Sequence, residues 1–122
     1  MSILSISIEG SVPSKKNSKK IITTRSGRRL LISSDSHRNW HTGAMWQLKI
    51  YGMPQISECE VIALFKVPDK RRRDLSNMWE SVGDVLVDAG ILEDDSMFHI
   101  KQLVLKGEIN KEDVGVDLQI IH

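Results

Sequence analysis

Short stretches of apolar or alternating residues recur along the chain and predict β-strands. They cover residues 3–8, 21–24, 30–32, 59–67, 98–106 and 114–121. Ser26-Gly27 separates the second stretch from the third, which predicts a β-hairpin with a glycine-containing turn. Gly10 and Pro13 end the first strand, and a polar, basic loop follows over residues 12–20.

A different period, close to 3.6 residues, predicts a helix over about residues 75–89. Its apolar side carries Leu75, Met78, Val82, Val85, Leu86 and Ala89, and its polar side carries Asp74, Asn77, Ser81, Asp84 and Asp88. Asp74 stands where an N-cap is expected, and Gly90 stands where a helix stops. A second helix begins at Ser34, Asp35 or Ser36 and ends before Gly52.

The order of these elements is strand, hairpin, helix, strand, helix and two strands. This order predicts the α+β class, with two main helices packed on one mixed sheet of about five to six strands. Residues 1–122 contain no repeat and no long linker, so we expect a single domain.

Composition narrows the class of protein only a little. The formal charge is +1, from 17 Lys and Arg against 16 Asp and Glu, which does not by itself indicate nucleic-acid binding. Cys59 is the one cysteine, so an intrachain disulfide and a Cys-rich zinc site are both excluded. No signal peptide or membrane-spanning stretch is evident, and we therefore expect a cytoplasmic protein without membrane partners.

The strongest chemical signal lies between Asp69 and His99. The basic run Lys70–Arg73 leads directly into Asp74, and the following helix ends before the acidic cluster Glu93, Asp94 and Asp95. Cations beside carboxylates suggest a bound phosphate beside a divalent metal, which needs only two or three acids. If the next strand packs beside the start of the helix, Asp74 and Asp95 could share one ion.

Plainer interpretations exist for each part of this signal. Asp74 alone is typical of an N-cap, an acidic turn is typical of solvated surface, and an arginine run is typical of a charged face. Their order along the chain favours a metal-dependent phosphodiester site.

Two segments resemble the RusA family of Holliday junction resolvases. The first is Arg72-Arg73-Asp74-Leu75-Ser76-Asn77 with the later Asp84-Val85-Leu86, Ala89-Gly90 and Asp94-Asp95, and the second is Val12-Pro13-Ser14-Lys15-Lys16-Asn17-Ser18-Lys19. The resemblance implies a small homodimeric, Mg²⁺-dependent endonuclease, often encoded by phages or prophages, that cuts four-way DNA junctions in recombination and repair; Mn²⁺ is an alternative ion.

The resemblance also assigns roles residue by residue. It implies that Asp74 and Asp95 are catalytic metal ligands, that the neighbouring Asp94 assists them as a further ligand, and that Asn77 is the motif asparagine. Phosphate contacts would come from Lys15, Lys16, Asn17, Lys19, Arg71, Arg72, Arg73 and Asn77.

Two positions depart from the family pattern. Ser76 replaces an aspartate, and Glu80 replaces a catalytic lysine. A hydroxyl is a weaker ligand than a carboxylate, and glutamate reverses the charge of lysine. Glu80 is either a replacement metal ligand, as in a similar pattern among RusA-like phage proteins, or a solvated helix residue. If Glu80 does replace the lysine, another cation such as Lys16 or Lys66 must stabilise the transition state.

Other features leave alternatives open. The basic residues of the first quarter form either an arm for the phosphate backbone or a solvated loop. Trp40 and Trp46 either stack on bases or belong to the core or an interface. His37 and His41 have zinc-ligand spacing on a helix, but without a third ligand nearby we favour surface histidines, with His37 also able to touch phosphate.

Two other function classes remain open beside the nuclease. The chain could be a catalytically inactive protein that binds branched DNA. It could also be an interaction module of a phage complex whose acidic helix face docks a basic partner.

Overall fold

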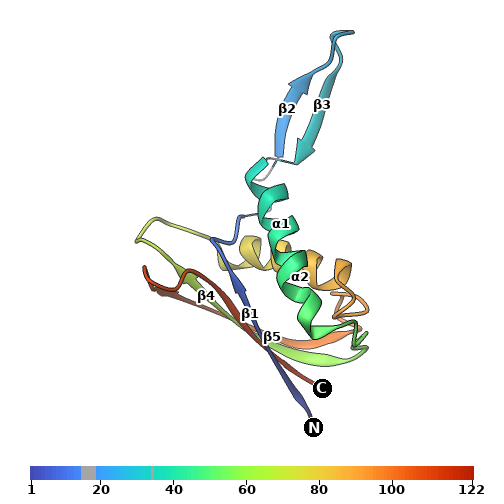
Figure 1. The fold of residues 1–122 in the computed structure, drawn as a ribbon, viewed down its shortest axis with the longest axis vertical. Coiled ribbons are helices and arrows are strands. Elements are labelled where there is room, and N and C mark those ends of the chain that lie inside the picture. The colour runs from blue at the N-terminus through green and yellow to red at the C-terminus, as the bar shows by residue number, and fades with distance from the viewer. Residues whose placement is uncertain (15–18, 34) are drawn as a thin grey trace.

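The computed structural model describes residues 1–14, 19–33 and 35–122. Its elements are β1 (Ile3–Glu9), β2 (Lys19–Thr23), β3 (Arg29–Ser33), α1 (Asp35–Leu48), the 3₁₀ helix η2 (Lys49–Tyr51), β4 (Cys59–Val67), α2 (Leu75–Asp88), β5 (Ile100–Ile109) and β6 (Gly115–Ile121). Every strand and helix that the sequence predicts is present (Figure 1). The α+β class and the order of elements are confirmed.

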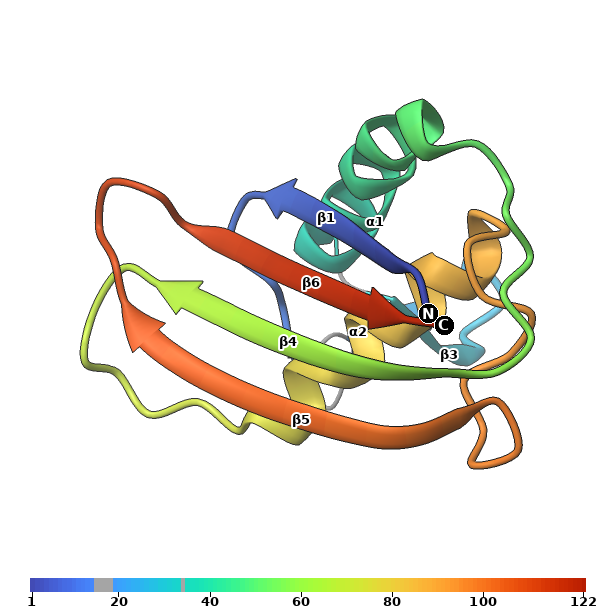
Figure 2. The ribbon, with the colours of Figure 1, turned by 90° about the horizontal axis from the view of Figure 1, so that it is seen from below.

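Four strands form a mixed sheet in the order β1-β6-β4-β5 (Figure 2). β6 pairs antiparallel with both β1 and β4, whereas β4 and β5 run parallel. Parallel neighbours need a crossover connection, and α2 supplies it. The loop before α2 therefore begins where β4 ends, and this loop carries the basic run.

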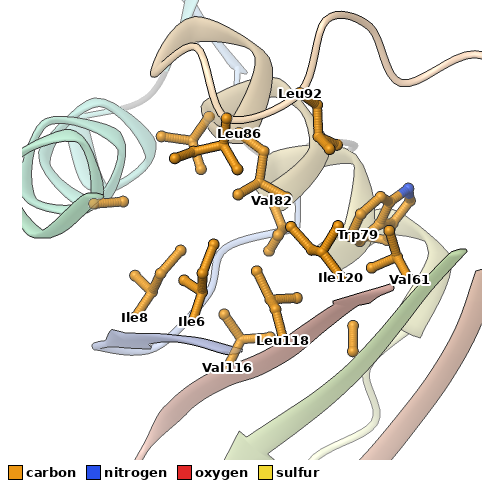
Figure 3. Packing of buried hydrophobic residues seen from close by; sticks show 14 of the residues in the cluster. Ile6, Ile8, Val61, Trp79, Val82, Leu86, Leu92, Val116, Leu118 and Ile120 are labelled. Atoms are coloured by element: carbon orange, nitrogen blue, oxygen red, sulfur yellow. The ribbon is translucent and has the colours of Figure 1, made fainter. Parts of the chain in front are cut away.

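The core lies between the sheet and the two helices, which cover one of its faces (Figure 1). Alternate residues of β4 and β6 point into it because successive side chains of a strand face opposite sides. Figure 3 shows these residues meeting the apolar side of α2. The fully buried residues of these three elements include Val61, Ala63, Phe65, Val82, Val85, Leu86, Val116, Leu118 and Ile120.

The ends of α2 match their sequence signals. Asp74 is the N-cap, with extended backbone angles of φ −94° and ψ 118°. Gly90 adopts φ 76°, which glycine tolerates because it lacks a Cβ. The N–H of Ile91 then donates to the carbonyl of Leu86 at 3.0 Å, satisfying a carbonyl that the helix end would leave unpaired.

The hairpin corrects the expectation of one sheet with five to six strands. β2 and β3 pair only with each other and form a separate two-stranded sheet. Figure 1 shows this hairpin projecting beyond the start of α1, away from the four-stranded sheet. None of residues 21–30 is buried, so the apolar positions among them do not belong to the core. Among the described helices, none is long and apolar enough to cross a membrane.

Candidate functional site

A cleft of about 660 Å³ opens beside the start of α2. Three segments line most of it: Ser11–Ser14 after β1, Arg71–Arg73 before α2, and the helix start with Asp74, Asn77 and Met78. Ser36, in the first turn of α1, also lines the cleft. The fold thus brings Val12–Ser14, the described start of the N-terminal motif, beside the Arg72–Asn77 motif, although they lie far apart in the sequence.

A buried hydrogen bond holds the first of these segments against α2. The hydroxyl of Ser81 donates to the carbonyl oxygen of Pro13 at 2.8 Å, and Ser81 is fully buried. The Ser11–Ser14 loop is therefore fixed beside the helix. The sequence placed Ser81 only on the polar side of the helix, because nothing in the pattern identifies a backbone carbonyl as its partner.

Asp74 occupies the N-cap position without acting as a conventional cap. Its carboxylate accepts no hydrogen bond from the helix backbone. It accepts one instead from the side-chain amide of Asn77, at 3.2 Å. The carboxylate is exposed in the cleft, at the positive end of the helix dipole, where a negative group is stabilised. It is therefore available to bind a cation.

The three arginines before α2, Arg71–Arg73, differ in their contacts. Arg73 folds back on its own loop: its guanidinium donates to the carbonyl oxygens of Asp69 and Arg71 at 3.2 and 2.9 Å, and pairs with the Asp69 carboxylate at 2.9 Å. A hydrogen bond from the backbone N–H of Arg71, aided by Arg73, lowers the pKa of Asp69. Arg71 and Arg72 are exposed in the cleft and can meet an anion.

In the acidic turn after α2, Asp94 and Asp95 have different surroundings. A hydrogen bond from the backbone N–H of Asp95, followed by one from the hydroxyl of Ser96, lowers the pKa of Asp94. His99 lies 3.7 Å from the same carboxylate. Asp94 therefore organises the turn. Asp95 is exposed and packs its carboxylate against α2 at Gly83.

One chain does not bring Asp74 and Asp95 to a single ion. Gly83 follows Asp74 by nine residues, which is about 13 Å along a helix. Asn77, the partner of Asp74, points about 120° away from Gly83 around the axis. In the described parts of the chain, no group of three or more His, Cys, Asp or Glu residues is arranged to hold a metal ion. The strand after the acidic turn pairs with β4, and the turn itself passes beside the middle of α2 rather than its start.

Comparison with known proteins agrees with the resemblance. No protein-family model matches the chain. A curated relative, "Crossover junction endodeoxyribonuclease RusA" of Aquifex aeolicus (strain VF5), is 31% identical over 83 residues. The chain belongs to the RusA-like family. The aligned part spans 66% of this chain and 66% of the relative, slightly less than two thirds of each.

The two departures of this RusA-like chain from the family pattern share one flank of α2. Glu80 lies about 60° from Gly83 around the axis and one turn before it, and Ser76 lies one turn before Glu80. Both side chains are exposed. Around the axis Glu80 lies midway between Asn77 and Gly83, and it does not line the cleft.

Several predicted site residues lie away from the cleft or outside the described residues. Lys15, Lys16 and Asn17 lie outside the described residues, and Lys19 begins β2. Lys66 lies on the sheet face away from the helices, where it pairs with the carboxylates of Asp113 at 2.6 Å and Asp117 at 3.0 Å. Lys66 is therefore not the cation that replaces the family lysine.

The structure also bears on the alternatives left open for the tryptophans and histidines of α1. Trp40 is buried in the core, but Trp46 is 65% exposed and covered by the ammonium of Lys49, 3.7 Å from its ring centre. His41 bridges the helices through a 2.8 Å contact between its Nε2 and the carboxylate of Asp88, and its ring stacks on His37. This contact makes His41 a helix-packing residue rather than a free surface histidine.

Proposed function

We propose that this RusA-like chain is a divalent-metal-dependent endonuclease that hydrolyses phosphodiester bonds in branched DNA, including four-way junctions. The observation that supports this most directly is the cleft, where Arg71 and Arg72 lie exposed beside the uncapped carboxylate of Asp74. The curated name of the relative, a crossover junction endodeoxyribonuclease, supports the same activity. A role in DNA recombination and repair, in the compartment that holds the DNA, follows from this activity as part of the proposal.

The donors at the cleft suit Mg²⁺, with Mn²⁺ as an alternative. Mg²⁺ in phosphate-handling sites is held by one or two carboxylates, retained waters and oxygens of the substrate. Asp74 supplies one carboxylate, and the side-chain amide nitrogen of Asn77 donates to it and orients it. Asp74 would hold the ion, and a divalent ion held there would supply a water of lowered pKa for in-line attack and positive charge for the departing 3′ oxygen.

The chain's own residues would position the substrate. Arg71 and Arg72 would neutralise the phosphates on either side of the scissile bond, since a guanidinium matches phosphate geometry. Arg73 would contribute indirectly, by fixing the loop on which the other two stand. Lys15, Lys16, Asn17 and Lys19 follow the cleft-lining segment Ser11–Ser14 in sequence and would extend the cationic surface.

We further propose that the active unit is a C₂ homodimer. Asp95 of the same chain is too far from Asp74, but a twofold axis can place the exposed Asp95 of one subunit near the Asp74 cleft of the other. Asp94 would hold that turn in shape, and Glu80, one turn before Gly83, would approach together with Asp95. A symmetric dimer also provides the two sites that paired cleavage of a four-way junction requires.

Strand cleavage tests the proposal. A labelled four-way junction and a matching linear duplex are incubated with Mg²⁺ or with EDTA, using the wild type and Asp74→Asn. We expect metal-dependent, paired incisions in the junction, and a loss of at least 100-fold for Asp74→Asn because its amide cannot replace a charged ligand. Junction binding without cleavage in Mg²⁺ or Mn²⁺ would instead identify a DNA-structure-binding protein, and indifference to DNA would indicate an interaction module.

Subunit mixing tests the dimer arrangement. Asp74→Asn and Asp95→Asn are each inactive in the proposal, but a mixed dimer keeps one site with both carboxylates if the site is shared between subunits. Mixing the two variants should therefore restore cleavage at one strand per junction. If the mixture stays as inactive as its components, the shared site is wrong.

A further inference from the structure

The projecting β2–β3 hairpin carries a concentrated positive charge. Residues 19–33 include the five cations Lys19, Lys20, Arg25, Arg28 and Arg29 and no acidic residue. The three arginines are exposed around a tight turn, in which the N–H of Thr24 donates to the carbonyl of Arg28 at 2.8 Å. This charge is unbalanced within the hairpin, although the whole chain has a formal charge of only +1.

Among the hairpin side chains that the structure describes, residues 21–30, none is buried. Ile21 is 66% exposed, and Ile22 and Leu30 are only half-buried. An isolated two-stranded hairpin is marginally stable in water. A ribbon that is cationic, without a buried side chain at residues 21–30 and separate from the main sheet gains most of its stabilisation from a partner, and its charge favours a polyanion.

Its position relative to the cleft defines which part of a polyanion it can reach. Ser14 and Ser36, which line the cleft, flank the hairpin in sequence. A five-residue strand and its turn span about 20 Å. Since duplex DNA rises about 3.4 Å per base pair, a hairpin of this length can reach about six base pairs from its base beside the cleft-lining Ser36.

We propose that the hairpin binds a duplex arm of branched DNA about six base pairs from the phosphate held at Asp74. This inference rests on the proposed function and adds to it a second, separate contact surface. The major groove, about 12 Å wide, admits a two-stranded β-ribbon. The tip arginines then contact phosphates at the groove edge, and the contact selects substrates by the length and direction of their arms.

Neutral backbone patches test the location of this contact. The probe is a four-way junction with arms of 20 base pairs, in which methylphosphonates replace the phosphates either at base pairs 5–9 or at base pairs 14–18 from the branch point. Binding is measured in EDTA so that no cleavage occurs. We expect the proximal patch to weaken binding by the wild type about tenfold or more, and the distal patch to leave it unchanged.

Charge removal on the protein completes the test. The variant Arg25→Gln/Arg28→Gln/Arg29→Gln should bind the unmodified junction about tenfold more weakly and should no longer respond to the proximal patch. The slope of log affinity against log salt should fall by up to about 2.7, since each phosphate contact contributes about 0.9. The control Lys101→Gln/Lys106→Gln/Lys111→Gln removes the same charge from β5 and the β5–β6 turn and should change neither quantity.

A cross-link gives the position independently of affinity. Cys59 is buried and is the one cysteine, so Ser26→Cys places a single accessible thiol at the tip for a photoactivatable label. The label should react with DNA about five to eight base pairs from the branch point, whereas a label on the control Ser57→Cys should not. Ser57 is exposed and lies just before β4, on the main body.

The outcomes separate this proposal from the proposed function. If the wild type cleaves junctions but the arginine variant binds like the wild type, or the proximal patch has no effect, the hairpin proposal is wrong and the nuclease proposal stands. If the wild type binds no junction at all, both are wrong, and the cationic hairpin is then a surface for an acidic protein.

Discussion

Gly83 should control the position of Asp95. A Cβ added at this glycine would lie 3.1 Å from Oδ2 of Asp95 and 3.7 Å from its Cβ. The first distance is a few tenths of an ångström too short for an unstrained contact, so the carboxylate or the turn that carries it must move. Trp79, the other neighbour, would be 3.6 Å away, which is ordinary contact.

The size of the effect follows from the sensitivity of catalysis to position. A misplacement of about 1 Å can cost about 100-fold in rate. A smaller shift of Asp95 should therefore lower kcat of Gly83→Ala for junction cleavage by about five- to twentyfold. KM should change little, because the arginine cleft lies on another side of α2. Stability should not fall, since alanine in a helix interior is favoured over glycine by about 1 kcal/mol and offsets the strain.

Gly43→Ala is the matched control. Gly43 lies inside α1, and a Cβ there would meet nothing within 4 Å. This variant should gain up to about 1 kcal/mol in free energy of unfolding and cleave at the wild-type rate. Denaturant unfolding and single-turnover cleavage measure the two quantities on the same samples. If Gly83→Ala gains as much stability as Gly43→Ala and keeps full kcat, the contact with Asp95 does not position it.

Two further predictions concern the loop and the sheet. Ser81→Ala removes the hydrogen bond to the Pro13 carbonyl, and should cost about 1 kcal/mol in free energy of unfolding and weaken junction binding several-fold, whereas Ser57→Ala, at an exposed site, should do neither. Unchanged binding in Ser81→Ala would mean that this loop takes no part in the site. The hydrogen bond from Lys66 to Asp113, together with Asp117, raises the pKa of Lys66 against the opposing effect of burial. A raised pKa stabilises the fold at lower pH, and this stabilisation is lost as pH rises above about 10, through the folded pKa. The melting temperature of the wild type should therefore fall more steeply than that of Lys66→Met between pH 9 and about 12, and parallel curves would contradict the pairing.

The strands and helices were predictable because an element that buries one face leaves a local pattern of apolar residues in the sequence. In β4, the continuous apolar run Val61–Phe65 predicted a strand, and in the structure Val61, Ala63 and Phe65 are buried while Ile62 and Leu64 are only partly buried. In α2, the apolar side and the signals at Asp74 and Gly90 gave both ends within one residue. The separation of β2 and β3 from the main sheet was not predictable, since Ile21 and Ile22 have the composition of core residues and strand pairing is decided by distant parts of the chain.

The candidate site was predictable where its residues are neighbours in sequence. Arg71, Arg72, Asp74 and Asn77 lie within one loop and one helical turn, so their proximity follows from local geometry. The relation of Asp95 to this group depends on how the turn after α2 returns to the sheet, and local pattern does not contain that path. One signal was present: a glycine at position 83, inside an otherwise strong helix, indicates a close approach by another part of the chain.

The places of the motif residues around α2 bear on which positions of the RusA-like site can change. Asp74 and Asn77 line the arginine cleft, whereas Ser76 lies on the side of Gly83, where Asp95 packs, and Glu80 lies between the two sides. Neither departure from the family pattern lines the cleft, which keeps its arginines, its aspartate and its asparagine. In a shared dimer site, a carboxylate gained at Glu80 would enter from the same subunit as Asp95 and would compensate for the one lost at Ser76. On this argument, Glu80→Gln should impair cleavage in the same subunit-mixing pattern as Asp95→Asn: it should be complemented by Asp74→Asn and not by Asp95→Asn.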